Sequence, residues 1–314
     1  MFKKLNIFEK LWLKHTNRPL YKDYKWELAN YNQQEFSKFI TGIDRLTTID
    51  KIVEFAATSG FISVSHSGNA GDIIYALPTL KRIHEITGTP VHLYLRLGKP
   101  LILSGYKSHP MGNVKLNKRM ADMLIPLLTS QSYIEICDIH TNQSVHIDMD
   151  YFHAGNIPLK TGNIARWCSY ITGVNPQLWK PWVSVKPNET YSDSIVIARS
   201  ERYRNHPISY SFLNSYKNIV FLGVESEYKD IKMAIPNIKW IQVNDFKEMA
   251  GIIAAARFFI GNQSFPFSIA ESLKIPRILE TSFDIINVIP EGENGFDFFF
   301  QDHFESIVKA LDSK

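Results

Sequence analysis

Short apolar runs alternate with stretches of helical periodicity along most of this chain of 314 residues. Residues 60–66, GFISVSH, form a short, mostly apolar run that predicts a buried strand. Residues 72–88 repeat apolar side chains at helical spacing and end at Gly88, so they predict a helix. A second strand is predicted at residues 90–98, PVHLYLRLG. Strand, helix and strand in this order are typical of a parallel unit.

The pattern is more regular in the second half of the chain. Apolar segments that predict strands recur about every 20 residues, at 194–198, 218–223, 238–243, 257–262 and 276–280. Helical stretches fill the gaps, and Asn244 and Asp245 supply capping side chains for one of them. Residues 304–314 predict a last helix. This alternation predicts a doubly wound α/β domain.

The remaining segments suggest how the chain divides. The N-terminal region up to about residue 55 predicts helices, and helical spacing recurs at residues 162–173. Residues 144–153 alternate and predict a strand, whereas residues 175–193 contain three prolines and predict a linker. We therefore predict an α/β protein with two domains, residues 1–185 and 186–314. A ligand is expected in the cleft between them.

Composition adds limits to this picture. The formal net charge of +4 is mildly basic and compatible with an anionic partner such as a nucleotide diphosphate. Two cysteines give no disulfide framework, so we expect a reducing, cytoplasmic location. No apolar run reaches the roughly 20 residues of a membrane span. The basic, amphipathic residues 1–14 are expected to pack on the protein itself, or to lie on an anionic membrane at its inner face.

The first candidate site follows the strand at residues 60–66. Gly68 and Gly71 let a ligand approach the backbone, and amides at a helix start favour an anionic group. Asp72 at that start is expected to be ionised, and an ionised carboxylate can accept a proton from an attacking hydroxyl. The alternative is that Asp72 only caps the helix and that the glycines only form a turn.

The second candidate site lies within residues 258–280, where strand, turn, helix and strand follow one another again. Asn262, Gln263 and Ser264 are polar side chains at the end of the strand, suited to hydrogen-bond a nucleotide or phosphate. Glu271, on the helix, could accept both ribose hydroxyls, because a carboxylate offers two oxygens. The alternative places Glu271 on a solvated helix face.

The two segments together resemble a known family. GNAGDIIYALPTL and FIGNQSFPFSIAESL are similar to the two signature regions of the GT-B glycosyltransferases of family 9, the ADP-heptose heptosyltransferase-like enzymes. Those signatures are close to S-x-G-D-x-x-x-A-L-P-x-L and F-I-G-N-D-S-G-P-M-H-L-A-A-A-L. The resemblance covers about residues 60–290 and implies two Rossmann-like domains facing across a cleft. It also implies that the second domain holds most of the nucleotide-sugar.

The resemblance further implies roles for single residues. Asp72 matches the proposed base of an inverting transfer, and the loop with Asn69 and Gly71 would approach the donor or the acceptor. Such enzymes need no bound metal and no separate cofactor, because amides, helix ends and basic side chains offset the diphosphate charge. Asp72 and the turn that begins at Asn262 must then share one gap.

This chain departs from the second signature at several positions. Gln263 stands where the family has aspartate, Phe265 where it has glycine and Ser268 where it has histidine. Glu271 is more similar to GT-B families that place a glutamate on the ribose. GNAGD is also similar to the G-N-x-G-D of polysaccharide pyruvyltransferases, which gives an alternative enzyme. A non-catalytic nucleotide-binding protein of the same fold is a further alternative.

Basic and acidic residues after other strands complete the candidate donor and acceptor sites. Arg199 and Arg202 follow the strand at 194–198 and are expected to hold the diphosphate with paired donors. Glu225 follows the next strand and is expected to bind the nucleotide. On the acceptor side we place His66, Asp148, Asp150 and Arg166. Alternation would also put His146 on one strand face with the two aspartates, which permits a metal site as a weaker alternative.

These features predict an inverting, metal-independent glycosyltransferase, of hexosyl or heptosyl type, in bacterial surface glycan or lipopolysaccharide-like synthesis. Its partners would be a nucleotide-diphosphate sugar and a glycan or glycolipid acceptor, with peripheral membrane contact as a further expectation. The sequence shows no basic face with interleaved aromatic residues, which is the pattern that indicates nucleic-acid binding. A transferase that acts on DNA bases could share this fold, so the acceptor is left open.

Overall fold

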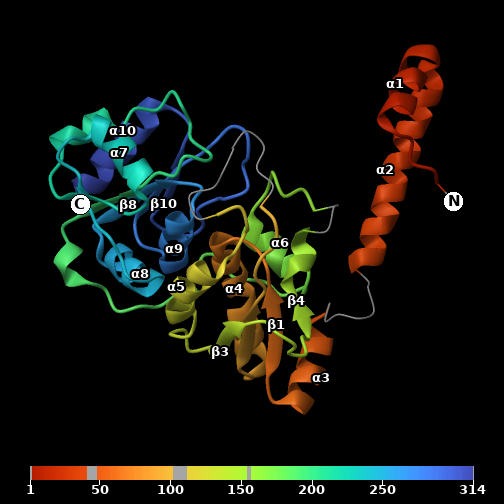
Figure 1. The fold of residues 1–314 in the computed structure, drawn as a ribbon, viewed down its shortest axis with the longest axis horizontal. Helices are drawn as coiled ribbons and strands as arrows, with labels where there is room; N and C mark the ends of the chain where they lie inside the picture. The colour runs from red at the N-terminus through yellow and green to blue at the C-terminus, as the bar shows by residue number, and fades with distance from the viewer. Residues whose placement is uncertain (1, 41–47, 102–111, 154–156, 314) are drawn as a thin grey trace.

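Two parallel β-sheets, each flanked by helices, make up most of the protein in a computed structural model that describes residues 2–40, 48–101, 112–153 and 157–313 (Figure 1). The strands of the first sheet are β1 Ile62–His66, β2 Val91–Leu95, β3 Ile134–Ile139 and β4 Ile147–Asp148. Those of the second are β5 Ile195–Ala198, β6 Ile219–Phe221, β7 Lys239–Trp240, β8 Phe258–Asn262, β9 Arg277–Glu280 and β10 Gly295–Phe298. The α-helices are α1 Ile7–Thr16, α2 Arg18–Ile40, α3 Ile49–Ser59, α4 Ala70–Thr87, α5 Lys118–Leu128, α6 Ile164–Tyr170, α7 Glu225–Ala234, α8 Phe246–Ala255, α9 Phe265–Leu273 and α10 Gln301–Asp312.

The order of the strands places both candidate sites at equivalent points. The first sheet runs β3-β2-β1-β4 and the second β10-β9-β8-β5-β6-β7, and the strands pair in parallel. Counted from β5, the second order is that of a Rossmann fold, so the predicted doubly wound α/β arrangement is confirmed. Strand order reverses between β1 and β4 in one sheet, and between β5 and β8 in the other. Ligands bind at such switch points, beyond the carboxyl ends of the strands.

The two halves share part of their hydrophobic core. One buried cluster contains Val64 and Ile73 from the first half together with Phe259 and Ala270 from the second. Helix α4 packs against α9, and α5 packs against α8 (Figure 1). Burial of apolar surface is the main favourable term in folding, so this shared cluster holds α4 and α9 against each other.

The segment predicted as a linker joins α4 to α9. Pro78 lies inside α4 and has no amide to donate to the carbonyl of Ile74. The buried indole of Trp182 donates to that carbonyl instead, at 3.0 Å. The backbone amide of Trp182 also donates to the carbonyl of Ser272 on α9, at 3.0 Å. The linker therefore satisfies the carbonyl that the proline leaves open and braces both helices of the candidate site.

Some elements differ from the sequence prediction. The prediction of a strand at residues 144–153 was wrong beyond Asp148, because Met149–His153 form a 3₁₀ helix. The amide of Asp150 donates to the side chain of Asp148 at 3.0 Å, a local bond that competes with continued strand pairing. The elements β3, α5 and β10 were not predicted.

The N-terminal helices were predicted, and they form α1, α2 and α3. Figure 1 shows α1 and α2 side by side as a hairpin that stands away from the two sheets. Across the described residues, none of the helices is both long enough and apolar enough to cross a membrane.

Candidate active site

Asp72 lies in the first turn of α4, directly beyond β1. Asn69 is the N-cap, and both its backbone and side-chain amides donate to Oδ2 of Asp72, at 3.0 and 3.2 Å. The other carboxylate oxygen, Oδ1, accepts no hydrogen bond from the residues that the structure describes. The capping interpretation of Asp72 is therefore correct for one oxygen, and the second oxygen is left to act on a ligand.

Gly68 allows the turn before α4 to be this tight. A Cβ added to Gly68 would lie 2.6 Å from Cε1 of His66 and 2.9 Å from Oδ2 of Asp72. The amide of Gly68 also donates to Nδ1 of His66 at 2.9 Å. A side chain at this position would have to push either the histidine or the carboxylate aside.

The two sequence motifs meet where α4 and α9 begin. A Cβ added to Gly71 would lie 3.8 Å from both the Cα of Phe265 and the Oγ of Ser268. The starts of α4 and α9 are therefore adjacent, and a single gap shared by Asp72 and the turn that begins at Asn262 stays a prediction. Two helix N-termini brought this close make a junction that favours negative charge, because the first amides of each helix lack partners within it.

Some polar atoms at this junction have no partner among the described residues. The side-chain oxygen Oε1 of Gln263, the hydroxyl of Ser264 and the hydroxyl of Tyr75 are buried and make no hydrogen bond to that part of the chain. Ser264 is the N-cap of α9, yet its side chain does not cap the helix. Buried polar groups without partners are uncommon in native proteins. Such atoms are available to a bound ligand or to water.

The groups around Asp72 keep their protons. Burial, the charge of Glu271 and the charge of Asp72 raise the pKa of Tyr75 well above its usual value, against an opposing effect of Arg277. Burial and Asp72 likewise raise the pKa of the Cys168 thiol. A neutral phenol and a neutral thiol cannot accept a proton from a substrate. Asp72 is thus better suited than either neighbour to act as a base.

The predicted acceptor residues His66, Asp148 and Asp150 come together at the β1–β4 switch point. The amide and hydroxyl of Ser67 donate to Asp150 at 2.8 and 2.6 Å. Nδ1 of His66 lies 3.9 Å from Oδ1 of Asp150. Two basic residues that the sequence analysis missed, Arg96 and Lys99, pair with Asp148 at 2.7 Å and with Asp150 at 2.8 Å. Basic residues directly after β2 were the available signal for both.

Asp150 should contribute to stability in a pH-dependent manner. Burial raises its pKa, but hydrogen bonds from Lys99 and Ser67 outweigh burial and hold the pKa at about 2, below 3.8. A lowered pKa stabilises the fold above the unfolded value, and that contribution is lost as the pH falls from about 4 to about 2. We expect Asp150→Asn to lower the free energy of unfolding at pH 7 by up to about 2 kcal/mol.

Urea unfolding of both proteins across this pH range measures the effect, with Asp122→Asn as the control. Asp122 pairs with Lys118 on the surface, where the pair should contribute little. A difference between the parent and Asp150→Asn that stays constant down to pH 2 would contradict the assignment.

The residues predicted to bind the donor have different surroundings. The side chain of Asn262 is buried and bonds to the backbone of Ser200 and Arg202, so it organises the loop after β5 rather than facing a ligand. Arg199 forms a bidentate ion pair with the buried Glu280, at 2.7 and 2.8 Å. Its charge is thereby balanced inside the protein. The guanidinium of Arg202 makes no ion pair with a described residue and lies over the ring of Tyr203.

The other predicted residues are engaged within the protein. Glu271 is 2% exposed, so the solvated-face interpretation was wrong, and its oxygens accept from Lys274, Arg277 and the amide of Glu291. These bonds argue against a ribose contact. Glu225 pairs with Lys229 on the surface of α7. Arg166 forms a bidentate pair with Glu291, which joins α6 to the second half rather than to the acceptor cluster.

The substituted positions of the second motif are accommodated by packing. The ring of Phe265 lies 4.2 Å from that of Phe246 on α8, measured between centroids. The hydroxyl of Ser268 donates to the carbonyl of Phe265 within α9 at 2.6 Å. Gln263 donates to the side chain of Asn287 at 3.0 Å. The departures from the family signature thus fill space and stabilise the start of α9.

Within the described part of the chain, no group of three or more histidine, cysteine, aspartate or glutamate residues could hold a metal ion. Nδ1 of His146 accepts a hydrogen bond from the amide of Ser63 at 3.0 Å, and its ring stacks on Phe61. His146 directly precedes β4, whereas Asp150 lies in the 3₁₀ helix after β4. The weaker metal interpretation of this region is therefore not supported. Metal independence of the reaction stays a prediction.

No protein-family model and no curated protein sequence matches the chain. Solved structures of similar fold include E. coli heptosyltransferase WaaC with ADP, with a TM-score of 0.55 and 10% identity over 80% of this chain and 99% of that one. The same enzyme with ADP-2-deoxy-2-fluoro heptose has a TM-score of 0.53 and 9% identity, over 79% of this chain and 99% of that one. TibC from enterotoxigenic E. coli, an iron-containing dodecameric glycosyltransferase, has a TM-score of 0.51 and 14% identity, over 75% of this chain and 61% of that one.

At identities of 9 to 14%, this similarity concerns the fold. The resemblance to heptosyltransferase-like proteins that the motifs suggested is thereby confirmed at the level of the fold.

Proposed function

We propose that this protein is an inverting, metal-independent glycosyltransferase of the GT-B type. It would transfer a hexose or heptose from a nucleotide-diphosphate sugar to an acceptor hydroxyl in a bacterial surface glycan or lipopolysaccharide. Residues 1–185 would form the acceptor-side domain and residues 186–314 the donor-binding domain. The observation that supports the proposal is the closeness of the starts of α4 and α9, where a Cβ added to Gly71, one residue before Asp72 in the chain, would lie 3.8 Å from the Cα of Phe265.

The donor would lie where α4 and α9 begin. The unpaired amides of both helices and the hydroxyl of Ser264 offer hydrogen bonds to a diphosphate. Arg202 would supply the positive charge, because Arg199 is neutralised by Glu280.

The reaction follows from this arrangement. Oδ1 of Asp72 accepts the proton of the acceptor hydroxyl. The oxygen atom of that hydroxyl then forms a bond to the anomeric carbon of the donor sugar. The bond between that carbon and the diphosphate oxygen breaks on the opposite face, so the configuration inverts. The nucleoside diphosphate leaves with the bonding electron pair, and helix amides and Arg202 stabilise the developing charge.

Incubation of the purified protein with ADP-, GDP-, UDP- and TDP-sugars tests the proposal. Slow release of the free nucleoside diphosphate from one of them, accelerated by a glycan acceptor, is the expected result. Binding of a nucleotide-sugar with no turnover in the presence of acceptors would instead favour a non-catalytic binding protein. Transfer of a pyruvyl group would favour the alternative enzyme that GNAGD suggests.

Arg202→Gln should weaken binding of the preferred nucleoside diphosphate. Hydrogen bonds to charged groups contribute about 1.5–3 kcal/mol, so the loss should be roughly 10- to 100-fold in Kd. Calorimetric titration measures it, with Arg18→Gln as a control at an exposed arginine of α2. An unchanged Kd in Arg202→Gln would show that Arg202 does not bind the nucleoside diphosphate.

A further inference from the structure

The N-terminal hairpin carries the net positive charge of the whole chain. Residues 2–28 contain seven lysine and arginine residues and three aspartate and glutamate residues, a net charge of +4. The formal net charge of all 314 residues is also +4. The remainder of the protein therefore has no net charge, and the excess of positive charge lies on α1 and α2.

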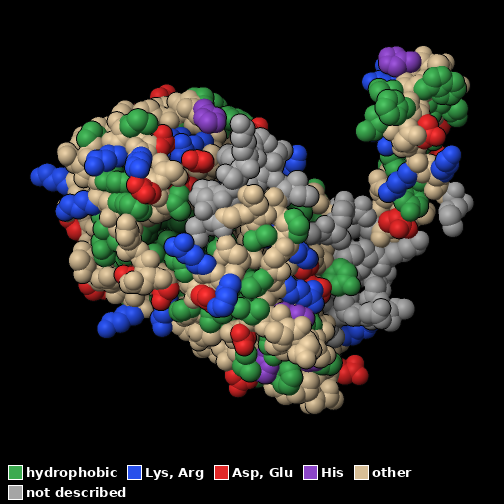
Figure 2. All heavy atoms as spheres, viewed as in Figure 1, with side chains coloured by type: hydrophobic (Ala, Val, Ile, Leu, Met, Phe, Trp, Pro, Cys, Tyr) green, Lys and Arg blue, Asp and Glu red, His purple; other side chains and the backbone are tan. Residues whose placement is uncertain are grey.

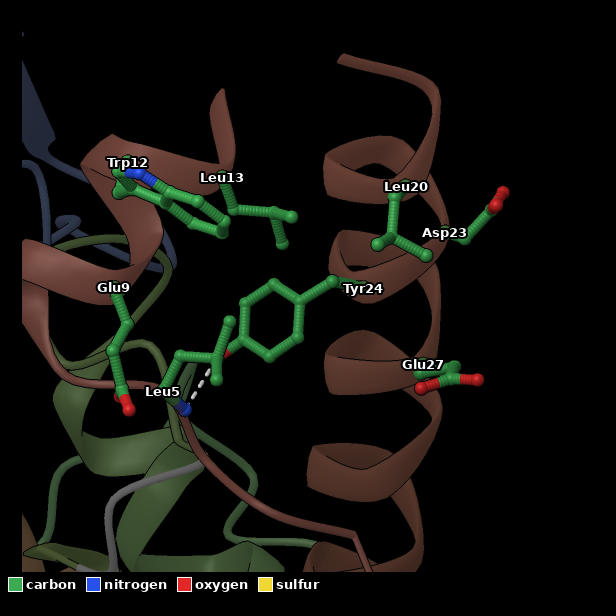
Figure 3. Close-up of a pocket in the computed structure, with 8 residues that line it drawn as sticks. All are labelled: Leu5, Glu9, Trp12, Leu13, Leu20, Asp23, Tyr24 and Glu27. Atoms are coloured by element: carbon green, nitrogen blue, oxygen red, sulfur yellow. Dashed lines mark hydrogen bonds between the residues drawn. The ribbon is translucent and has the colours of Figure 1, made fainter. Parts of the chain in front are cut away.

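The inner faces of α1 and α2 hold the hairpin together. Leu13 and Tyr24 are buried, and the hydroxyl of Tyr24 accepts a hydrogen bond from the amide of Leu5 at 3.2 Å. Figure 3 shows Leu13, Leu20 and Tyr24 pointing into the space between the helices, which holds a hollow of about 410 Å³. Phe2 stacks on Tyr24 and on Tyr31. This hollow belongs to the packing of the hairpin and lies apart from the candidate active site.

The outer face of the hairpin is apolar and exposed. Ile7, Phe8, Leu11 and Trp12 are 72%, 83%, 49% and 68% exposed. Their spacing gathers them on one side of α1: Ile7, Phe8 and Leu11 lie away from the buried Leu13, and Trp12 lies at the edge, where it also lines the hollow. On α2, Trp26 is 69% exposed and adjoins the exposed Lys22 and Lys25. Figure 2 shows apolar and basic side chains gathered on the hairpin. Exposed apolar surface of this kind marks an interaction site.

We propose that the α1–α2 hairpin docks on an anionic lipid bilayer. Phe8 and Trp12 enter the interfacial region, and the lysine and arginine residues contact lipid phosphates. The net charge of +4 on residues 2–28 favours an anionic bilayer as the binding partner. A second copy of the hairpin would bring a further charge of +4 to the contact and repel the first.

The docking goes beyond the proposed transfer reaction and can be tested without it. It would hold the candidate active site close to a lipid-borne acceptor, but its test reads vesicle binding. Failure of either proposal therefore leaves the other standing.

Co-sedimentation of the full-length protein with vesicles tests the docking. Vesicles of phosphatidylcholine mixed with phosphatidylglycerol should retain the protein, and vesicles of phosphatidylcholine alone should not. Concentrated NaCl should release it, because the charge component is screened. Equal retention by neutral vesicles, or none by anionic vesicles, overturns the proposal.

Variants of the hairpin locate the binding surface. The triple variant Lys14→Gln, Lys22→Gln and Lys25→Gln should bind anionic vesicles roughly 100-fold more weakly. Its charge-matched control carries Lys217→Gln, Lys247→Gln and Lys309→Gln, all exposed in the second half. The control should bind like the parent, and equal losses in both triple variants would overturn the proposal.

The apolar contribution has its own pair of variants. Phe8→Ser with Trp12→Ser should weaken vesicle binding by at least about tenfold, because both side chains leave water on docking. Met233→Ser with Phe300→Ser, at positions 79% and 60% exposed elsewhere, should leave binding unchanged. If the parent dimerises without lipid and Phe8→Ser with Trp12→Ser abolishes the dimer, the face belongs to a second copy. Retention by duplex DNA but not by vesicles also overturns the proposal.

Discussion

Replacement of Asp72 by asparagine is expected to lower the turnover of sugar transfer by about 10²- to 10⁴-fold, the usual contribution of a general base. An amide cannot accept the proton of the acceptor hydroxyl. It can still accept the hydrogen bonds from Asn69 that begin α4. Affinity for the nucleotide-sugar and the melting temperature should therefore change little. The measurement is kcat with saturating donor and acceptor, together with donor Kd.

Asp245→Asn is the matched control for this experiment. Asp245 is the N-cap of α8 and accepts from the amide of Glu248 at 2.8 Å, so the same chemical change is made at another helix start. Its variant should keep the parental kcat. Parental turnover in Asp72→Asn would show that another group removes the proton, and the proposed mechanism would be wrong.

Replacement of Glu271 by alanine is expected to lower the free energy of unfolding by roughly 3–5 kcal/mol, the range found when one partner of a buried ion pair is removed. Glu271 accepts hydrogen bonds from both Lys274 and Arg277, and Arg277 is fully buried. Burial lowers the pKa of Lys274 to about 8, although Glu271 opposes that change. Without Glu271 both cations would lose their partner, so Lys274 should lose its proton more readily.

Urea denaturation measures the effect of Glu271→Ala, and Glu225→Ala is the control. The side chain of Glu225 is 62% exposed in its pair with Lys229, so its removal should change stability by less than about 0.5 kcal/mol. If Glu271→Ala had parental stability but bound the nucleotide more weakly, the structural role would be wrong and the ribose contact predicted from the sequence would be supported.

Local patterns were sufficient to predict the elements around the candidate site. The apolar run of β1, the glycines after it and the helical spacing of α4 depend on neighbours in the chain, and each formed as predicted. The same holds for β8 and α9, where Pro266 lies in the first turn of the helix. The prediction missed the helix α5 and the strands β3 and β10, and each of these strands occupies an edge of its sheet. An edge strand buries less surface and leaves a weaker hydrophobic pattern.

The sequence by itself determined that two strand–turn–helix motifs exist and that Asp72 stands at the start of a helix. Only the tertiary structure decided which charged side chains still face a ligand. Arg199 meets Glu280 81 residues later, and Glu271 is enclosed by cations in the interior. A residue type specifies what a side chain can bind. Burial and distant partners decide what it does bind, because a charge removed from water must be paired.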